Sequence, residues 1–299
     1  MKLSTFLDER RQNAEAVILD GAVGTELNRR GFAIDDHPLW SVHALNHRKG
    51  RQLLQEIHRD YAEAGADIVT ANTFRINPRL LDRYGMLGKG AELAVEAVSL
   101  ARRAAPGVFV AGSMSPLESC YTPSLVPDTD VLYAAHRLSA VWLAAAGVDL
   151  ILIETMTTIR ESVAALAAAR ELGLPAVVSF CCGPEGRLLG GESLEDAIQA
   201  CEDRAIAIAV NCVAVGDLGA ALRILSQRAV VDKGFYANFG ALDGMGHWEA
   251  LAGLTPDFYA AFAEGWRKRG IRWVGGCCGS TPEHIAVLAK QGRAMRVAS

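Results

Sequence analysis

Two adjacent cysteines near the C-terminus are the most informative residues of this sequence. Cys277 and Cys278 stand between glycines in the stretch VGGCCGSTPEHI, residues 274–285. Neighbouring side chains of a regular strand point to opposite faces, so both thiols can reach one atom only where a strand ends in a sharp bend. The flanking glycines have the conformational freedom that such a bend requires.

A third thiol, Cys212, closes the apolar run IAIAVNC, residues 206–212. Three thiolates from two strand ends form a plausible Zn²⁺ site, with Zn–S distances of about 2.3 Å and a fourth position left open. An open position is typical of catalytic zinc, because structural zinc has four protein ligands. The sequence therefore predicts that Cys212, Cys277 and Cys278 are both metal ligands and catalytic residues.

This ligand set also indicates the chemistry. Three thiolates and one Zn²⁺ carry a net negative charge, so the metal is a weak Lewis acid and activates water poorly. It is better suited to a thiol substrate, because a free thiol with a pKa of about 8.5 is mostly protonated at neutral pH, whereas a coordinated thiol is deprotonated. We expect the site to present a substrate thiolate to an electrophilic carbon.

Eight short apolar runs alternate with amphipathic stretches along the 299 residues. Each run is apolar nearly throughout, as a strand covered on both faces should be. The expected strands are residues 17–20, 67–72, 108–112, 150–154, 176–180, 206–211, 235–238 and 271–275. This repetition predicts an α/β protein, a single (β/α)8 TIM barrel over residues 1–299 with residues 1–14 as a lead-in helix.

Helical periodicity of apolar residues lies between these runs. The expected helices are residues 51–64, 161–171, 194–202, 218–227, 257–269 and 283–290. Thr255-Pro256 and Thr281-Pro282 each place a hydroxyl before a proline, which is the pattern of a helix N-cap followed by the first helical residue.

Functional side chains of such barrels come from the C-terminal ends of the strands. Polar and thiol groups gather at these ends in this sequence. They are Asp20, Gly21, Thr73, Ser113, Glu154, Cys181, Cys182, Cys212, Asn238, Cys277 and Cys278. Glu154 ends an apolar run, where a buried acid without a partner would be costly, so a binding role is favoured for it.

Composition excludes several classes of function. The net charge of −4 and the absence of a basic stripe argue against a nucleic-acid partner. No apolar run is long enough for a membrane span or a secretion signal, which predicts a cytoplasmic protein. An odd number of cysteines, seven, also makes a disulfide framework improbable.

Several motifs together resemble the homocysteine S-methyltransferase family. They are DGAVGTEL near the N-terminus, HRDYAEAGADIVTANTFR, AGSMSPLE, ETM at 154–156, VNC at 210–212 and GGCCGSTPEHI, spread over about residues 15–290. The resemblance implies that Cys212, Cys277 and Cys278 bind zinc. It also implies that Asp20, Gly21, Thr73 and Glu154 hold the amino-acid end of homocysteine, with Ser113 and Asn238 as weaker candidates.

The resemblance favours a sulfonium methyl donor, S-methylmethionine or S-adenosylmethionine, and methionine as the product. Aromatic faces suit such a cation, and Trp40, Phe74 and Tyr121 are the candidates. The betaine-type family members carry a C-terminal extension and a tyrosine where this chain has Thr155, and cobalamin use would need further domains. Ala241 stands where S-methylmethionine users have an acid, which leaves a betaine-type donor as the alternative.

Other interpretations compete with this one. A zinc hydrolase on the same barrel would need histidine or carboxylate ligands, which the strand ends do not supply in number. A non-catalytic zinc- or thiol-binding barrel would fill the fourth position with protein. Cys181 and Cys182 are interpreted as core residues that could compete for metal, and Cys120 and Cys201 as structural. The natural thiol or selenol acceptor and the oligomeric state stay open.

Overall fold

The computed structural model describes residues 1–34, 37–242, 248–250 and 253–293. Eight parallel strands form its centre, each within three residues of the predicted positions at either end. They are β1 (Val17–Ile18), β2 (Ile68–Ala71), β3 (Phe109–Met114), β4 (Leu150–Met156), β5 (Ala176–Phe180), β6 (Ala207–Ala214), β7 (Asp232–Asn238) and β10 (Trp273–Gly276). The prediction of a TIM-type α/β barrel is confirmed.

Strand order shows how the barrel closes. The order is β1-β10-β7-β6-β5-β4-β3-β2, and all neighbours in it pair in parallel. A single parallel bridge between Leu19 and Ile68 joins the two ends. The backbone N–H of Asp20 donates to the Ile68 carbonyl at 3.0 Å across this seam. The predicted site residue Asp20 therefore lies at the seam where the barrel closes.

Side chains along β4 alternate between two apolar cores, one inside the barrel and one between the strands and the surrounding helices. Leu150 and Leu152 point into the barrel, whereas Ile151 and Ile153 pack in the outer layer against the helices. Glu154 follows at the next inward position, because successive side chains of a strand alternate between its faces. The strand thus carries an acid to the mouth of the barrel.

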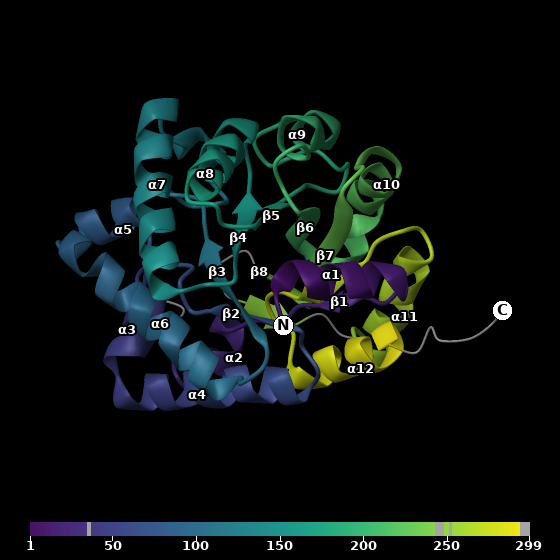
Figure 1. Ribbon diagram of the computed structural model, residues 1–299, viewed down its shortest axis with the longest axis horizontal. Coiled ribbons are helices and arrows are strands. Elements are labelled where there is room, and N and C mark those ends of the chain that lie inside the picture. The colour runs from purple at the N-terminus through teal and green to yellow at the C-terminus, as the bar shows by residue number, and fades with distance from the viewer. Residues whose placement is uncertain (35–36, 243–247, 251–252, 294–299) are drawn as a thin grey trace.

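Helices surround the strands on all sides (Figure 1). Those that were predicted are α1 (Leu3–Gln12), α4 (Arg48–Glu63), α8 (Ile159–Glu171), α9 (Leu194–Cys201), α10 (Leu218–Arg228), α11 (Pro256–Arg267) and α12 (Pro282–Arg293). Two long helices were not among those predicted, α6 (Gly90–Ala104) and α7 (Thr129–Ala146). The Thr255 side chain caps α11 by accepting from the Phe258 backbone N–H at 3.2 Å.

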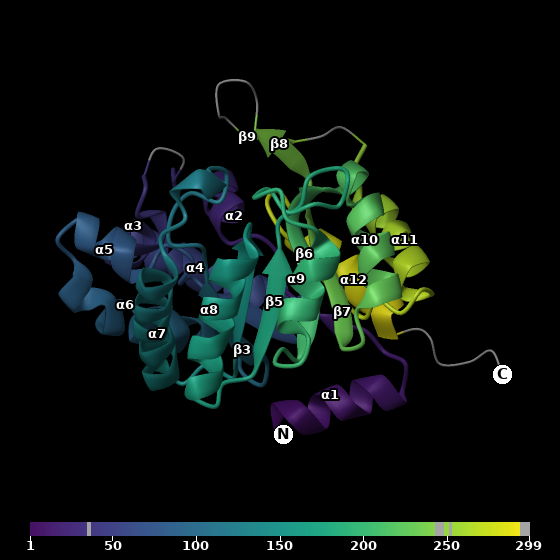
Figure 2. The same ribbon diagram turned by 90° about the horizontal axis from the view of Figure 1, so that it is seen from above.

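The two ends of the barrel carry different additions. The hairpin of β8 (Gly240–Leu242) and β9 (Trp248–Ala250) stands at one end, and α1 lies across the other (Figure 2). Three short helices, α2 (Gly24–Arg29), α3 (Trp40–Asn46) and α5 (Pro78–Arg83), fill loops that were not predicted to be helical. Within the described ranges, no helix has both the length and the apolar character that crossing a bilayer requires.

Candidate active site

The structure brings Cys212, Cys277 and Cys278 together. Their Sγ atoms all lie within 4.8 Å of one another, and all three residues are half-buried. Cys212 comes from β6, and the cysteine pair follows β10, with β7 between them. Three sulfur atoms at this spacing can bind one metal ion, and within the described chain no other group of three or more histidine, cysteine or acidic residues does so.

Backbone conformation at Cys212 turns its thiol toward the pair. Cys212 has a φ of +58°, in the left-handed region that non-glycine residues rarely adopt. The register between β6 and β7 shifts at this point, between Asn211 and Ala214. Such a bulge changes the direction of a side chain at a strand end. The thiol therefore depends on a local departure from regular strand geometry.

Asn238 at the end of β7 connects the two sources of thiols. Its Nδ2 lies 3.7 Å from Cys212 Sγ, and its Oδ1 accepts a 3.1 Å hydrogen bond from the Cys278 backbone N–H. An amide that contacts one metal-site thiol and the backbone of another restrains their separation. Asn238 is thus placed to orient sulfur atoms, which is a different role from the predicted contact with substrate.

The glycines beside the cysteine pair are needed mainly for space. A Cβ atom at Gly276 would lie 2.2 Å from the Ser280 Oγ, and one at Gly275 would lie 2.6 Å from the Leu19 Cβ. Of the three flanking glycines only Gly279 has a positive φ, +81°. The expectation of flexible glycines therefore holds for Gly279, whereas the other two permit close packing of β10 on the β1 end.

A cavity of about 270 Å³ opens beside the sulfur atoms. Its wall includes the three thiols and four of the predicted binding residues, Asp20, Gly21, Ser113 and Glu154. Thr73 and Asn238 are not among the described residues that line it. The volume suits small molecules, because ligand pockets of enzymes commonly fall in or near this size range.

Asp20 is held by the neighbouring strand β2. Its Oδ2 accepts from the Thr70 backbone N–H at 2.7 Å, and its Oδ1 accepts from the Thr70 hydroxyl at 2.8 Å. Burial nevertheless raises the pKa of Asp20 to about 7, against the lowering effect of these hydrogen bonds. A cationic ligand beside Asp20 would favour its ionised form.

Glu154 shares this electrostatic environment. Burial raises the pKa of Glu154 to about 7, and the nearby Asp20 carboxyl raises the pKa further, although a hydrogen bond from the Ser113 hydroxyl opposes this. The buried Tyr236, which also lines the cavity, lowers the pKa of Glu154 in the same sense as Ser113. Two buried carboxyls on one cavity make an environment that favours a positive charge.

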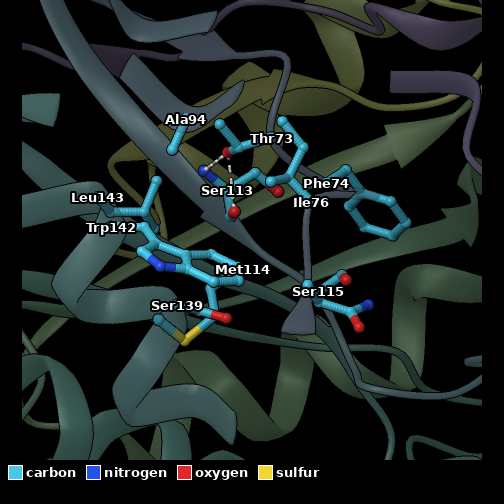
Figure 3. A pocket seen from close by; sticks show the side chains of 11 residues that line it. Thr73, Phe74, Ile76, Ala94, Ser113, Met114, Ser115, Ser139, Trp142 and Leu143 are labelled. Atoms are coloured by element: carbon cyan, nitrogen blue, oxygen red, sulfur yellow. Dashed lines mark hydrogen bonds between the residues drawn. The ribbon is translucent and has the colours of Figure 1, made fainter. Parts of the chain in front are cut away.

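Thr73 holds a residue of the cavity wall, Ser113, in place. Its hydroxyl donates to the Ser113 carbonyl and accepts from the Ser113 N–H, both at 2.9 Å (Figure 3). These two bonds use the hydroxyl internally, beside a separate small cavity of about 10 Å³. Thr73 thus fixes the position of Ser113, which in turn contacts Glu154.

Asn211 and Thr155 are site residues for which the sequence predicted no role. Thr155 has a φ of +63°. The Asn211 Oδ1 accepts from the Thr155 N–H at 2.9 Å and from the Ser179 hydroxyl at 2.7 Å, while its Nδ2 donates to the Thr155 hydroxyl at 2.9 Å. Both lie directly beside Glu154 or Cys212 in sequence. The only sequence signal was their place at strand ends.

The remaining cysteines lie at different distances from the centre. Cys181 Sγ is 3.6 Å from the Cys212 carbonyl, and Cys120 lines the cavity. The pKa of the Cys212 thiol is lowered because the thiols of Cys181, Cys277 and Cys278 donate hydrogen bonds to it. Cys181 and Cys120 are therefore close to the chemistry, more so than a purely structural interpretation implies.

Aromatic side chains form part of the cavity wall, as predicted for Trp40, Phe74 and Tyr121. The Trp40 and Phe74 rings stack with centroids 6.4 Å apart. The Tyr121 hydroxyl lies 3.6 Å from Cys212 Sγ. The wall thus brings aromatic surface directly to the sulfur cluster.

Comparison with known proteins gives a consistent family. The model of a family described as homocysteine S-methyltransferase matches residues 17–291. The homocysteine S-methyltransferase of Escherichia coli is 31% identical over 313 residues, which cover 96% of this chain and 97% of that protein. The metallated crystal structure of the E. coli homocysteine methyltransferase MmuM has a TM-score of 0.82 at 27% identity, covering 97% of this chain and 99% of that chain.

A longer relative matches over part of its length. The methionine synthase of Mycobacterium leprae is 31% identical over 288 residues, which cover 90% of this chain. The same alignment covers 24% of that protein, so the chain spans about a quarter of its length.

Proposed function

The chain belongs to the homocysteine S-methyltransferase family, and from that premise we propose that it transfers a methyl group from a sulfonium donor to the thiol of homocysteine, giving methionine. The donor we propose is S-methylmethionine or S-adenosylmethionine. The observation that carries the proposal is the cluster of three thiols on the wall of a cavity of about 270 Å³. A cytoplasmic location stays a prediction.

We propose zinc as the metal of this cluster. Three thiols fit a soft or borderline ion, and Cys212, Cys277 and Cys278 would be its ligands. When bound, the metal would supply the positive charge that keeps a substrate thiol deprotonated at neutral pH. The protein's part is to hold the three sulfur atoms, with Asn238 restraining Cys212 relative to Cys278.

Asp20 and Glu154 are the proposed partners of the homocysteine ammonium group. Both line the cavity, and the buried pair lacks a cationic partner in the described chain. An ammonium group between them would favour their ionised forms. Ser113 holds Glu154 by its hydrogen bond, and Thr73 holds Ser113. Gly21 would contribute only its backbone groups. A side chain has no room there, because a Cβ would lie 2.6 Å from the Tyr61 hydroxyl.

Methyl transfer then depends mainly on positioning. Holding a nucleophile and an electrophile in line can lower the activation barrier by about 7–11 kcal/mol. Tyr121 and Trp40 supply aromatic faces in the same cavity, which favour a sulfonium or quaternary ammonium group through cation–π attraction. The side chain of Ala241, where S-methylmethionine users have an acid, lies outside the described residues.

A panel of donors tests the proposal. Zinc-loaded protein is incubated with homocysteine and, in turn, S-methylmethionine, S-adenosylmethionine and glycine betaine, and methionine is measured by mass spectrometry. We expect methionine with a sulfonium donor. Methionine with betaine alone would establish the betaine-type alternative, and no methionine with any of the three would reject the proposed reaction.

A spectroscopic experiment separates catalysis from a non-catalytic zinc barrel. X-ray absorption at the zinc edge is recorded with and without homocysteine. We expect an additional sulfur in the metal's coordination shell when homocysteine is added, since the fourth position must be open to substrate. An unchanged shell would indicate a metal whose ligands all come from the protein.

A further inference from the structure

Arg75 is a cation without a partner in the cavity wall. It lines the cavity beside the thiols, and its Nε is fully enclosed. None of its side-chain nitrogens has a hydrogen bond or an ion pair with the described residues. Its guanidinium lies over the Phe74 ring, 5.3 Å from the ring centroid. Apart from this aromatic contact, nothing in the described chain compensates its charge.

A partly buried guanidinium is normally paired. Arg10, for example, is partly buried and forms a 2.7 Å ion pair with Asp67. Burial lowers the pKa of Arg75, but an arginine stays protonated under all ordinary conditions. Withdrawing part of an unpaired cation from water is costly, because that part of its hydration is lost without replacement. The geometry therefore leaves Arg75 ready for an anion that enters the cavity.

The charged surroundings of Arg75 differ from those of the two carboxyls. The groups whose charges influence it are Cys120 and Tyr121, and neither Asp20 nor Glu154 forms an ion pair with it. The two carboxyls are assigned to the homocysteine ammonium, and Arg75, whose charge is influenced by Tyr121 and by neither carboxyl, is left for another ligand of the cavity.

A second ligand can use Arg75. Tyr121, which is close to Arg75, has its hydroxyl 3.6 Å from Cys212 Sγ. A molecule anchored on Arg75 thus extends along Tyr121 toward the sulfur cluster. Since one face of Phe74 is already covered by the guanidinium, Trp40 and Tyr121 are the aromatic rings available to the cationic end of that molecule.

We propose that Arg75 binds the carboxylate of the methyl donor, so that the donor must carry a free carboxylate as well as its onium group. The inference rests on the proposed function. S-methylmethionine, S-adenosylmethionine and betaine all have this chemistry. A guanidinium pairs with a carboxylate through two parallel hydrogen bonds, which fixes orientation as well as affinity. Arg75 would thereby set the distance from the donor's anchor to the reacting sulfur.

Binding of matched ligands to matched variants tests this without turnover. Isothermal calorimetry on zinc-loaded protein, with no homocysteine present, compares S-methylmethionine with its carboxamide, which lacks the charge. The variants are Arg75→Gln, Arg75→Lys and, as a control, Arg223→Gln, which changes an exposed arginine on α10. Loss of a charged hydrogen-bonded pair should weaken S-methylmethionine binding by about 10- to 100-fold in Arg75→Gln.

The expected pattern has three further parts. Arg75→Lys should recover part of the affinity, Arg223→Gln should match wild type, and the carboxamide should bind wild type and Arg75→Gln equally. Arg75→Gln should not lower the melting temperature, because it removes a partly buried charge that has no partner among the described residues. Titrations of wild type with S-adenosylmethionine and with betaine show which carboxylate-bearing donor gains most from Arg75.

Several outcomes would overturn the inference. They are unchanged S-methylmethionine affinity in Arg75→Gln, equal wild-type affinity for acid and carboxamide, a loss confined to homocysteine binding, or failure of wild type to bind any carboxylate-bearing donor. The donor-panel assay is independent of these titrations. Protein that binds donors through Arg75 but forms no methionine would reject the proposed reaction and retain the carboxylate site.

Discussion

The thiol of Cys212 differs in surroundings from those of Cys277 and Cys278. Cys212 accepts hydrogen bonds from neighbouring thiols, which lowers its pKa, whereas the pKa values of Cys277 and Cys278 are raised. Cys212, Cys277 and Cys278 would hold the metal as thiolates, so metal binding would release protons from the cluster.

Replacing Cys212 with serine should abolish metal binding. The change leaves two of the three clustered thiols, and serine is a poor zinc ligand. We expect metal content to fall from about one equivalent per chain to near zero, measured by metal-release colorimetry and mass spectrometry. Cys201→Ala, which changes a buried cysteine on α9, is the control and should retain metal. Full metal content in Cys212→Ser would show that the cluster is not the site.

The buried carboxyl of Glu154 should make the stability of the metal-free protein depend on pH. The pKa of Glu154 is raised from 4.5 to about 7, so between these values the folded protein retains a proton that the unfolded chain has released. The free energy of unfolding therefore falls as the pH rises through this window. At pH 8 the cost is at most about 3 kcal/mol.

Glu154→Gln removes this titration. We expect the variant to be more stable than wild type at pH 8, with a smaller difference at pH 4.5, in urea denaturation of metal-free protein. Glu185→Gln, at an exposed loop position, is the matched control and should follow wild type at both pH values. An equal stability difference at both pH values would show that Glu154 does not titrate between them.

Among the secondary-structure elements, β4 and β6 end in the same way. Each has a non-glycine residue of positive φ among its last three residues, Thr155 in β4 and Cys212 in β6, and each shows a shift of register with its neighbour there. Asn211 joins the two ends through hydrogen bonds to Thr155, and a third hydrogen bond reaches Ser179 on β5. Three strands are thus fastened directly beneath Glu154 and Cys212.

Asn211→Leu should weaken this connection between β4, β5 and β6. The change removes three buried hydrogen bonds and leaves the Thr155 N–H without an acceptor, at a cost of about 3–5 kcal/mol in unfolding free energy. Urea denaturation of the metal-free protein measures it, and metal affinity should also fall because Cys212 loses its fixed position. Thr155→Gly keeps the backbone hydrogen bond and suits the positive φ, but it removes the hydroxyl that accepts from Asn211 Nδ2, so it should cost about 1–3 kcal/mol, less than Asn211→Leu. Similar losses in both variants would contradict the role of Asn211.

At the scale of the whole molecule, the candidate active-site residues lie at one end of the barrel and residues that contribute mainly to stability lie at the other, as is general for barrels of this type. The thiols and the cavity lie at the C-terminal ends of the strands. At the opposite end α1 covers the barrel, with Phe6 and Leu7 packed into the inner core beside Val17 and Trp273 (Figure 2). The 2.7 Å ion pair between Arg10 and Asp67 fastens α1 to the residue before β2.

Phe6→Ala should therefore affect stability alone. The ring is 6% exposed and packs against Phe109 with centroids 5.2 Å apart. Its removal should cost about 3–5 kcal/mol in urea denaturation, with metal content and the KM for homocysteine unchanged. Phe258→Ala, which removes a ring that is 49% exposed, is the control and should cost much less. A changed KM in Phe6→Ala would contradict the separation of the two ends.

The repeating local pattern was enough to predict the barrel and to select the three thiols that the structure brings together. Each of the eight apolar runs indicates a strand from its local sequence alone, and the residues around it also indicate where that strand ends. For this reason the amino-acid pattern alone assigns Cys212, Cys277 and Cys278 to one pole, where their sulfur atoms do meet. The helices α6 and α7 were not predicted, although α8, which is at least as rich in alanine, was.

Only the tertiary structure decided which polar groups reach the cavity. Thr73 and Asn238 stand at strand ends as predicted, yet their side chains are used by Ser113 and by the thiol cluster. Arg75, the last residue of the HRDYAEAGADIVTANTFR motif, was given no role from the sequence and is left without a partner among the described residues of the cavity wall. Hydrogen-bond and charge partners come from residues distant in sequence, and whether a polar group is satisfied within the protein is fixed only when those residues meet.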